Sequence, residues 1–255
     1  MSEFVSLTRA RALPGLRMAM VRHIPSPWGQ AAKAFFELKG LPFVRAERAG
    51  DDPETLLREW SGQESFPVVA WEQERPRSGW AEILFLAERL APEPALIPTD
   101  PERRTLLFGL AHEICGEMGL GWCGRLLMIH GALTADPTNA FFTAFGAKYG
   151  YSARAAAAAP ERSAAVLRQL DARLAASRAA GGRYLLGDRL TALDVYWATF
   201  SNLIEPLAPE QCPMPDFFRA MFTSVDPTTR AALTPALLAH RDFVFREHLT
   251  LPMEL

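Results

Sequence analysis

The sequence is poor in cysteine and lysine, and the shortage of cysteine limits the chemistry that the protein can perform. Only three cysteines occur, Cys115, Cys123 and Cys212, an odd number that implies no disulfide framework. Because none precedes Cys115, the N-terminal part of the chain has no Cys-x-x-C pair, and we expect no thiol–disulfide exchange there. Three of the 27 cationic residues are lysines, which we attribute to codon bias.

An excess of charge of one sign and long apolar runs are also missing. The 27 cationic residues are balanced by 29 acidic ones and scattered along the chain, which disfavours bulk electrostatic binding of nucleic acid. Glu, Arg, His or Gly interrupts every apolar stretch before the roughly 20 residues of a membrane span. The first residues lack the apolar core and cleavage site of a secretory signal. We therefore expect a soluble, cytoplasmic protein without nucleic-acid or membrane partners.

Strand and helix patterns alternate in the first third of the chain. Residues 1–14 are predicted to form an irregular arm. The order β-α-β-α-β-turn-(β)-α follows, with strands predicted over 16–24, 43–47 and 66–71 and helices beginning near Ser26, Asp52 and Gly79. This order has too few elements for a doubly wound dinucleotide-binding fold.

A proline-rich linker over 93–101 separates this part from a region in which only helical periodicity remains. Helical patterns are predicted over 102–132, 140–158, 161–180, 192–203 and 229–249. The sequence thus predicts a small α/β domain over 15–92 and an all-helical domain over 102–255, a combined length that can bury a large core.

Three motifs follow one another at regular spacing. They are Ser26-Pro27-Trp28-Gly29-Gln30 with Glu37-Leu38-Lys39-Gly40-Leu41-Pro42-Phe43 downstream, then Phe66-Pro67-Val68-Val69, and then Tyr184-Leu185-Leu186-Gly187-Asp188-Arg189-Leu190-Thr191-Ala192-Leu193-Asp194. In the third motif Thr191 and Asp194 have the spacing of a capping box, so its role is to begin a buried helix. Together the motifs resemble the glutathione transferase superfamily, whose members carry S-P-[FW], V-P-V-L and F-L-x-G-D-x-[LF]-T-x-A-D segments in this order.

The resemblance implies a thioredoxin-like N-terminal domain, an all-helical C-terminal domain and a homodimer. It also implies glutathione as co-substrate, with its thiolate attacking a small electrophile. No tyrosine precedes Tyr149 and no cysteine precedes Cys115, so the chain is identified as an atypical, bacterial-like member of the serine type with Ser26 as the catalytic hydroxyl. A helix N-terminus favours a bound anion, which is the reason that Ser26 is placed to stabilise a thiolate. The alternative is that Ser26 is only the N-cap of its helix.

The same resemblance suggests residues that bind substrate. The backbone of Phe66, followed by a cis Pro67, would meet the cysteinyl part of glutathione. The γ-glutamyl end would meet Arg77 and Ser78, although the acidic residue usual there is missing, and Arg77 would repel an ammonium and attract a carboxylate. A different carboxylate-bearing ligand, or a binding module without transferase activity, is therefore an alternative.

Other aromatic and polar residues have two interpretations each. Trp28 either covers the thiol site or packs inward. Glu113 and Trp122 line the electrophile pocket or belong to the core. The glycines Gly116, Gly119, Gly121 and Gly124 each lower helix stability by about 1 kcal/mol, which close helix packing or room for substrate would offset. The spacing of His112, Cys115, Cys123 and His130 matches no common zinc pattern, and we predict no metal.

Overall fold

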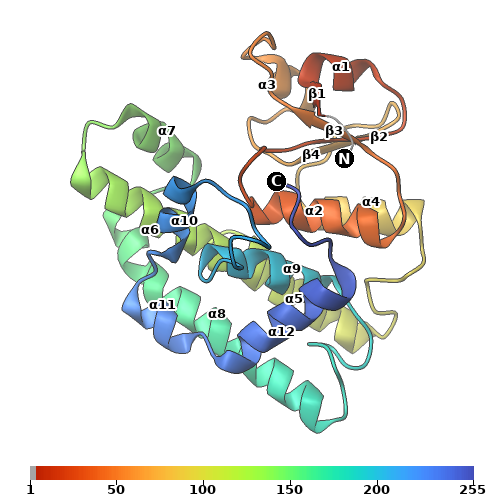
Figure 1. The fold of residues 1–255 in the computed structure, drawn as a ribbon, viewed down its shortest axis with the longest axis vertical. Helices are drawn as coiled ribbons and strands as arrows, with labels where there is room; N and C mark the ends of the chain where they lie inside the picture. The colour runs from red at the N-terminus through yellow and green to blue at the C-terminus, as the bar shows by residue number, and fades with distance from the viewer. Residues whose placement is uncertain (1–3) are drawn as a thin grey trace.

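A computed structural model describes residues 4–255 and contains one mixed four-stranded sheet in the order β1-β3-β2-β4 (Figure 1). Both β1 and β2 pair in parallel with β3, and β4 pairs antiparallel with β2. The strands are β1 (Val5–Ser6), β2 (Leu16–Ala19), β3 (Val44–Glu47) and β4 (Val68–Trp71). Residue Arg77 adds an isolated antiparallel bridge to Val69, which corresponds to the strand expected after the turn.

Helices cover both faces of this sheet because the side chains of its strands alternate in direction. Leu16 and Met18 of β2 belong to the core shared with α2 and α4, whereas Ala19 packs with residues of α1 and α3 on the other face. Figure 1 shows these two pairs of helices on opposite sides of the sheet. Their bounds are α1 (Leu7–Ala12), α2 (Pro27–Leu38), α3 (Leu56–Ser61) and α4 (Trp80–Leu90).

The irregular arm expected over 1–14 is wrong for residues 4–14, which form β1 and α1; residues 1–3 lie outside the described part. The Asp52 carboxylate, which is 9 % exposed, explains why this helix forms. It accepts hydrogen bonds from the N–H groups of Leu7 and Thr8 and from the Thr8 hydroxyl. This acceptor lies more than 40 residues along the chain, whereas the local signal is Ser6, the N-cap whose side chain accepts a hydrogen bond from the Arg9 N–H at 3.2 Å.

Helices make up the rest of the described chain. They are α5 (Pro101–Cys115), α6 (Leu120–Ala135), α7 (Ala140–Lys148), α8 (Ala153–Ala179), α9 (Ala192–Phe200), the 3-10 turn η1 (Ser201–Leu203), α10 (Asp216–Thr223), α11 (Pro227–Ala232) and α12 (Pro235–His248). None of the helices within residues 4–255 is long and apolar enough to cross a membrane.

Three of the predicted helical stretches are divided, and α10 was not predicted at all. The stretch 102–132 breaks between α5 and α6, where Met118 has a φ of 55°. Gly150, with a φ of 59°, ends the stretch that was expected to run from 140 to 158. Pro235 begins α12 and thereby divides 229–249, since proline at the first position of a helix cannot continue the preceding one.

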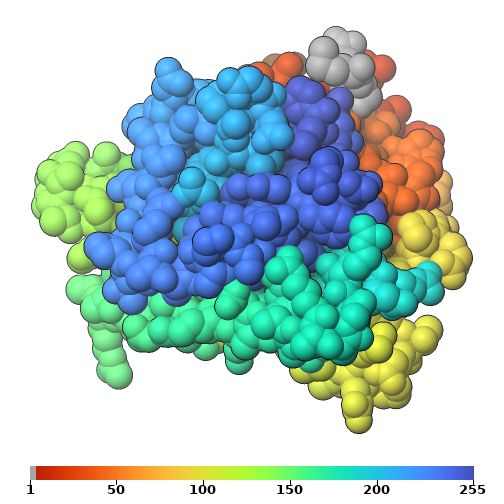
Figure 2. Space-filling view, turned by 60° about the horizontal axis from the view of Figure 1, so that its bottom comes forward, coloured from red at the N-terminus to blue at the C-terminus, as the bar shows by residue number. Residues whose placement is uncertain are grey.

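The N-terminal and helical parts meet along α2. This helix packs on α9, with Phe35 edge-to-face against Tyr196 at 5.1 Å between ring centroids. The C-terminal residues also lie against α2, where the Glu254 carbonyl accepts hydrogen bonds from Gln30 and Lys33. Figure 2 shows the dark blue C-terminal residues next to the orange N-terminal part. The exact domain boundaries proposed from sequence stay a prediction.

Candidate functional site

Ser26 lies at the start of α2 with its hydroxyl unused. Its backbone is extended, with a φ of −60° and a ψ of 112°, and Pro27 takes the first helical position, as the sequence predicts. The Ser26 side chain makes no capping hydrogen bond, and within residues 4–255 its hydroxyl has no other hydrogen-bond partner. The residue is half-buried. The interpretation of Ser26 as a mere N-cap therefore has no side-chain hydrogen bond to support it.

The loop before β4 contains the predicted cis peptide bond between Phe66 and Pro67. Pro67 faces a small cavity that is bounded by α2, by the N-terminal half of α4 and by α9. The lining residues are Trp28, Ala32, Phe35, Pro67, Ser78, Trp80, Ile83 and Tyr196. The cavity thus brings together three of the predicted binding residues, Trp28, Pro67 and Ser78, whereas Ser26, two residues before Trp28, is not part of its wall.

This cavity is narrow. Its volume is about 10 Å³, which is close to the space that one water molecule needs. Trp28 and Trp80 are both part of its wall, and Trp80 is in edge-to-face contact with Tyr196 at 5.6 Å. A cavity of this volume does not hold a tripeptide.

Trp28 packs inward against the helical part, which is one of the two interpretations that the sequence allowed. Its Nε1 donates a hydrogen bond to the carbonyl of Cys115 at 2.9 Å, and its ring meets Phe200 edge-to-face at 4.8 Å. A Cβ at Gly121 would lie 2.9 Å from Trp28 Cη2 and 2.5 Å from Phe200 Cε1. The glycine at 121 therefore makes room for the aromatic rings, whereas a Cβ at Gly124 would meet nothing within 4 Å.

Arg77 forms an ion pair within the protein. Its guanidinium donates to Glu74 at 2.5 Å, and its backbone forms the bridge to Val69. Hydrogen bonds from Arg89 and Arg77 hold the pKa of the Glu74 carboxyl below its usual value. Because one Glu74 carboxylate is shared by Arg77 and Arg89, it offsets only part of the charge of Arg77.

Sequence reasoning missed Glu82, which lies in the first turn of α4 beside Ser78. The Glu82 carboxylate accepts a hydrogen bond from the Gly79 N–H at 3.3 Å and pairs with Arg75 at 3.0 Å. The first turn of α4 thus carries an acidic group, although no acid occupies the position directly before Ser78. The signal that could have found it is the three-residue spacing from Gly79 to Glu82, which is that of a helix N-cap and its third helical residue.

Glu113 and Trp122 do not line the cavity beside Pro67. The Glu113 carboxylate pairs with Arg162 of α8. Trp122 donates to the carbonyl of Tyr149 at 3.1 Å and packs against that ring at 4.8 Å. These contacts are those of helix packing, the alternative that the sequence left open for both residues.

The cysteines and histidines of the helical part also do not line the cavity beside Pro67. Burial raises the pKa of the Cys115 thiol well above its usual value, so Cys115 is not a thiolate near neutral pH. Across residues 4–255, no group of three or more His, Cys, Asp and Glu side chains is placed to hold a metal ion.

The chain resembles known proteins in its structure and not in its sequence. No family profile matches the sequence, and no curated protein matches it. Solved structures do match. A glutathione S-transferase from Methylobacterium radiotolerans JCM 2831, in complex with glutathione sulfonate, superposes with a TM-score of 0.62 at 20% identity, over 92% of each chain. The chain has the glutathione transferase fold.

Two further solved structures have a similar fold. Rice GST1, solved in complex with glutathione, has a TM-score of 0.60 and 21% identity, over 94% of this chain and 93% of its own. The beta-etherase LigF from Sphingobium sp. strain SYK-6 has a TM-score of 0.61 and 16% identity, over 92% and 96% of the two chains. At these identities the likeness establishes the fold and leaves the reaction to be argued from the site.

Proposed function

We propose that the protein is a glutathione transferase that conjugates the thiolate of glutathione to a small electrophile. The observation that carries this proposal is the Ser26 hydroxyl, which stands at the start of α2 and makes no hydrogen bond within the described chain. A thiolate held there would accept this hydroxyl's hydrogen bond and lie at the positive end of the helix dipole. Structural neighbours crystallised with glutathione or its sulfonate support the proposal.

The thiolate is the reacting species because a thiol is a far weaker nucleophile. On binding, the thiol proton leaves to solvent and the sulfur keeps the electron pair. With an aryl halide, this pair forms the new sulfur–carbon bond and the halide departs with the electrons of the bond that breaks. Ser26 keeps its own proton throughout and stabilises the sulfur by donating a hydrogen bond.

The start of α4 is suited to the γ-glutamyl end of glutathione. Within residues 4–255 the N–H groups of Trp80 and Ala81 form no hydrogen bond, so they and the Ser78 hydroxyl can hold a carboxylate at the helix N-terminus. Glu82, which is in the same turn, would supply a carboxylate for the ligand ammonium, which would then share this carboxylate with Arg75 and the Gly79 N–H. In this proposal Glu82 replaces the acidic residue that the sequence lacks before Ser78.

Substitution of Ser26 tests the proposal, with a second serine as a matched control. Ser26→Ala should lower the rate of conjugation of glutathione to an aryl halide more than about tenfold, or roughly 1.4 kcal/mol of barrier, with little effect on stability because its hydroxyl caps nothing. The hydroxyl of Ser152 does cap its helix, since it accepts from the Ala155 N–H at 3.1 Å. Ser152→Ala should therefore lower stability by about 1 kcal/mol and leave the rate unchanged. Equal rates for Ser26→Ala and the wild type would refute the catalytic role.

One observation favours a second candidate function, a ligand-binding module without transferase activity. The cavity between Trp28, Pro67 and Ser78 has a volume of only about 10 Å³, which is too small for glutathione. Calorimetric titration separates the two functions. Heat of binding together with conjugation supports the transferase, whereas absence of heat and of any thermal shift at millimolar glutathione supports the module. The homodimer and the cytoplasmic location stay predictions of the resemblance and the composition.

A further inference from the structure

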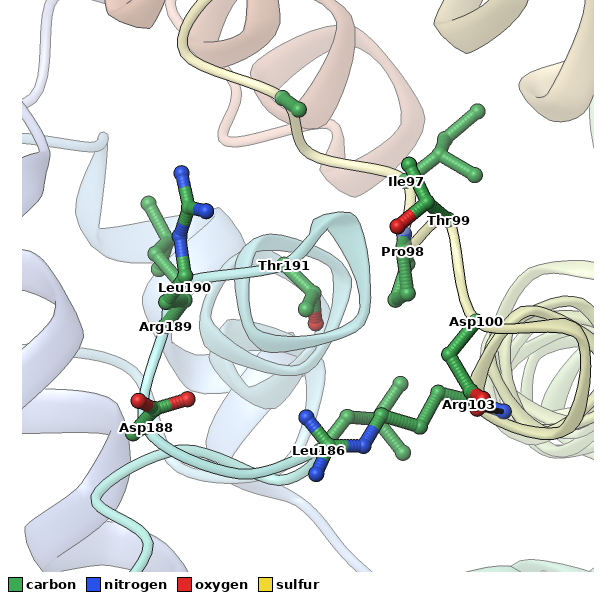
Figure 3. A pocket seen from close by; sticks show the side chains of 11 residues that line it. Ile97, Pro98, Thr99, Asp100, Arg103, Leu186, Asp188, Arg189, Leu190 and Thr191 are labelled. Carbon is green, nitrogen blue, oxygen red and sulfur yellow. Dashed lines mark hydrogen bonds between the residues drawn. The ribbon is translucent and has the colours of Figure 1, made fainter.

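A second and larger cavity lies apart from the Ser26 region, between the linker that precedes α5 and the loop that precedes α9 (Figure 3). Its volume is about 190 Å³. The linker contributes Ala95, Ile97, Pro98, Thr99 and Asp100, α5 contributes Arg103, and the loop contributes Leu186, Asp188, Arg189, Leu190 and Thr191. No residue is shared with the cavity beside Pro67.

The wall of this cavity is partly apolar. Ile97 and Leu186 are 7% and 3% exposed, and Pro98 and Leu190 are half-buried beside them. Thr191 also lines the cavity, but its hydroxyl already donates a hydrogen bond to the Asp194 carboxylate at 2.8 Å, so the polar groups open to a ligand are the charged side chains. The cavity therefore offers an apolar surface next to groups that form hydrogen bonds, which is the usual composition of a small-molecule site.

Charges of both signs stand at this cavity without partners. Among the side chains of residues 4–255, the guanidinium groups of Arg103 and Arg189 and the carboxylate of Asp188 form no ion pair or hydrogen bond with one another or with other residues, and all three residues are exposed at the rim of the cavity. Figure 3 shows Arg103 and Asp188 directed along the same side of the cavity. The neighbouring Asp100 carboxylate is already engaged, because it accepts from the Arg103 N–H at 2.8 Å as the N-cap of α5.

Gly187 leaves room for the Arg103 side chain. Gly187 has a φ of 121°, and a Cβ on it would lie 3.2 Å from the Arg103 Nη1. The absence of a side chain at Gly187 lets the guanidinium lie across the loop. The cation thus stays beside the cavity without meeting the carboxylate of Asp188.

We propose that this cavity binds a small zwitterion, namely an aliphatic α-amino acid. Arg103 would pair with the ligand carboxylate, Asp188 with its ammonium, and Ile97, Leu186 and Leu190 would surround its side chain. A simple anion would leave Asp188 facing a like charge, and a simple cation would do the same to Arg103. A ligand that carries both charges satisfies both residues at once.

The size of the cavity agrees with this class of ligand. A protein cavity of roughly 150 Å³ accommodates benzene. A cavity of about 190 Å³ therefore suits a branched aliphatic amino acid and is too small for a tripeptide. The inference is independent of the proposed transferase activity, since it concerns other residues and another ligand.

Titration of the whole protein with L-leucine tests the proposal by calorimetry or ligand-observed NMR. Isocaproate, which lacks the ammonium, and isoamylamine, which lacks the carboxylate, serve as ligand controls. We expect leucine to bind at least about tenfold more tightly than either, in line with the strength of charge-assisted pairs. Equal binding of isocaproate and leucine, or no leucine binding at millimolar concentration, would overturn the proposal.

Variants then assign the site. Arg103→Gln and Asp188→Asn should each raise the Kd for leucine about tenfold or more while the melting temperature stays close to that of the wild type. Arg104→Gln is the matched control, because Arg104 lies over the rings of Phe85 and Phe108, outside the cavity wall. Leucine affinity that is unchanged in Arg103→Gln and in Asp188→Asn would refute the assignment, as would an equal loss in Arg104→Gln.

Discussion

A methyl group added at Gly121 tests whether the contact between α6 and Trp28 holds the two parts of the protein together. In Gly121→Ala the new Cβ would lie 2.5 Å from Phe200 Cε1 and 2.9 Å from Trp28 Cη2. Both rings are held in place, Trp28 by its hydrogen bond to the Cys115 carbonyl and Phe200 by its full burial. The methyl group therefore displaces one ring or the other.

Three contributions determine how much Gly121→Ala changes the free energy of unfolding. Overpacking of a close-packed core costs about 1–3 kcal/mol, and loss of the Trp28 hydrogen bond costs about 1 kcal/mol more. Replacement of glycine by alanine in a helix returns about 1 kcal/mol. We expect Gly121→Ala to be less stable than the wild type by about 2 kcal/mol.

Gly124→Ala is the matched control in the same helix. Its Cβ would meet nothing within 4 Å, so only the gain in helix propensity remains, and the variant should be about 1 kcal/mol more stable. Chemical denaturation, followed by tryptophan fluorescence and by circular dichroism, measures both changes. A Gly121→Ala protein as stable as Gly124→Ala would refute the packing argument.

Three more predictions concern charge and burial. Burial alone would raise the pKa of Asp52, but hydrogen bonds from Ala49, Thr8 and Leu7 hold this pKa below its usual value. The stabilisation of the folded protein by the ionised Asp52 is therefore complete above the unfolded pKa of about 3.9 and is lost as the pH falls through the lowered folded pKa. Asp52→Asn should cost about 2 kcal/mol at pH 7, a difference from the wild type that shrinks in acid denaturation curves. Cys115 should resist iodoacetamide in the native protein at neutral pH and react after unfolding, because the thiol is buried and its pKa is raised. Mass spectrometry measures the labelling. Rapid labelling of Cys115 in the native protein would contradict this prediction. Glu82→Gln should weaken glutathione binding about tenfold in calorimetry while Glu59→Gln does not, and equal affinities would remove Glu82 from the site.

Local patterns predicted the elements near Ser26 well. Proline at the first helical position and Gly40 after the last turn mark both ends of α2, and the structure places the helix between them. The Thr191–Asp194 spacing likewise begins α9, where Asp194 accepts from the Thr191 N–H at 2.9 Å. These features depend on residues a few positions apart, which a sequence shows directly.

Features that depend on distant residues were missed. The helix α1 rests on Asp52, and the position of Trp28 rests on Gly121 and the Cys115 carbonyl. The pairing of Arg77 with Glu74 was not predicted from the sequence either. In each case the partner is brought near by the fold or by a turn whose shape the sequence leaves open.

The ionisation of bound glutathione tests the account most directly. Ultraviolet absorbance of the thiolate, followed against pH for glutathione bound to the wild type and to Ser26→Ala, gives the pKa of the bound thiol in each. We predict a pKa well below the value of about 8.5 for a free thiol in the wild type, and a return toward that value in Ser26→Ala. A bound thiol that titrates like free thiol in the wild type, or at the same pH in both proteins, would contradict the role of Ser26.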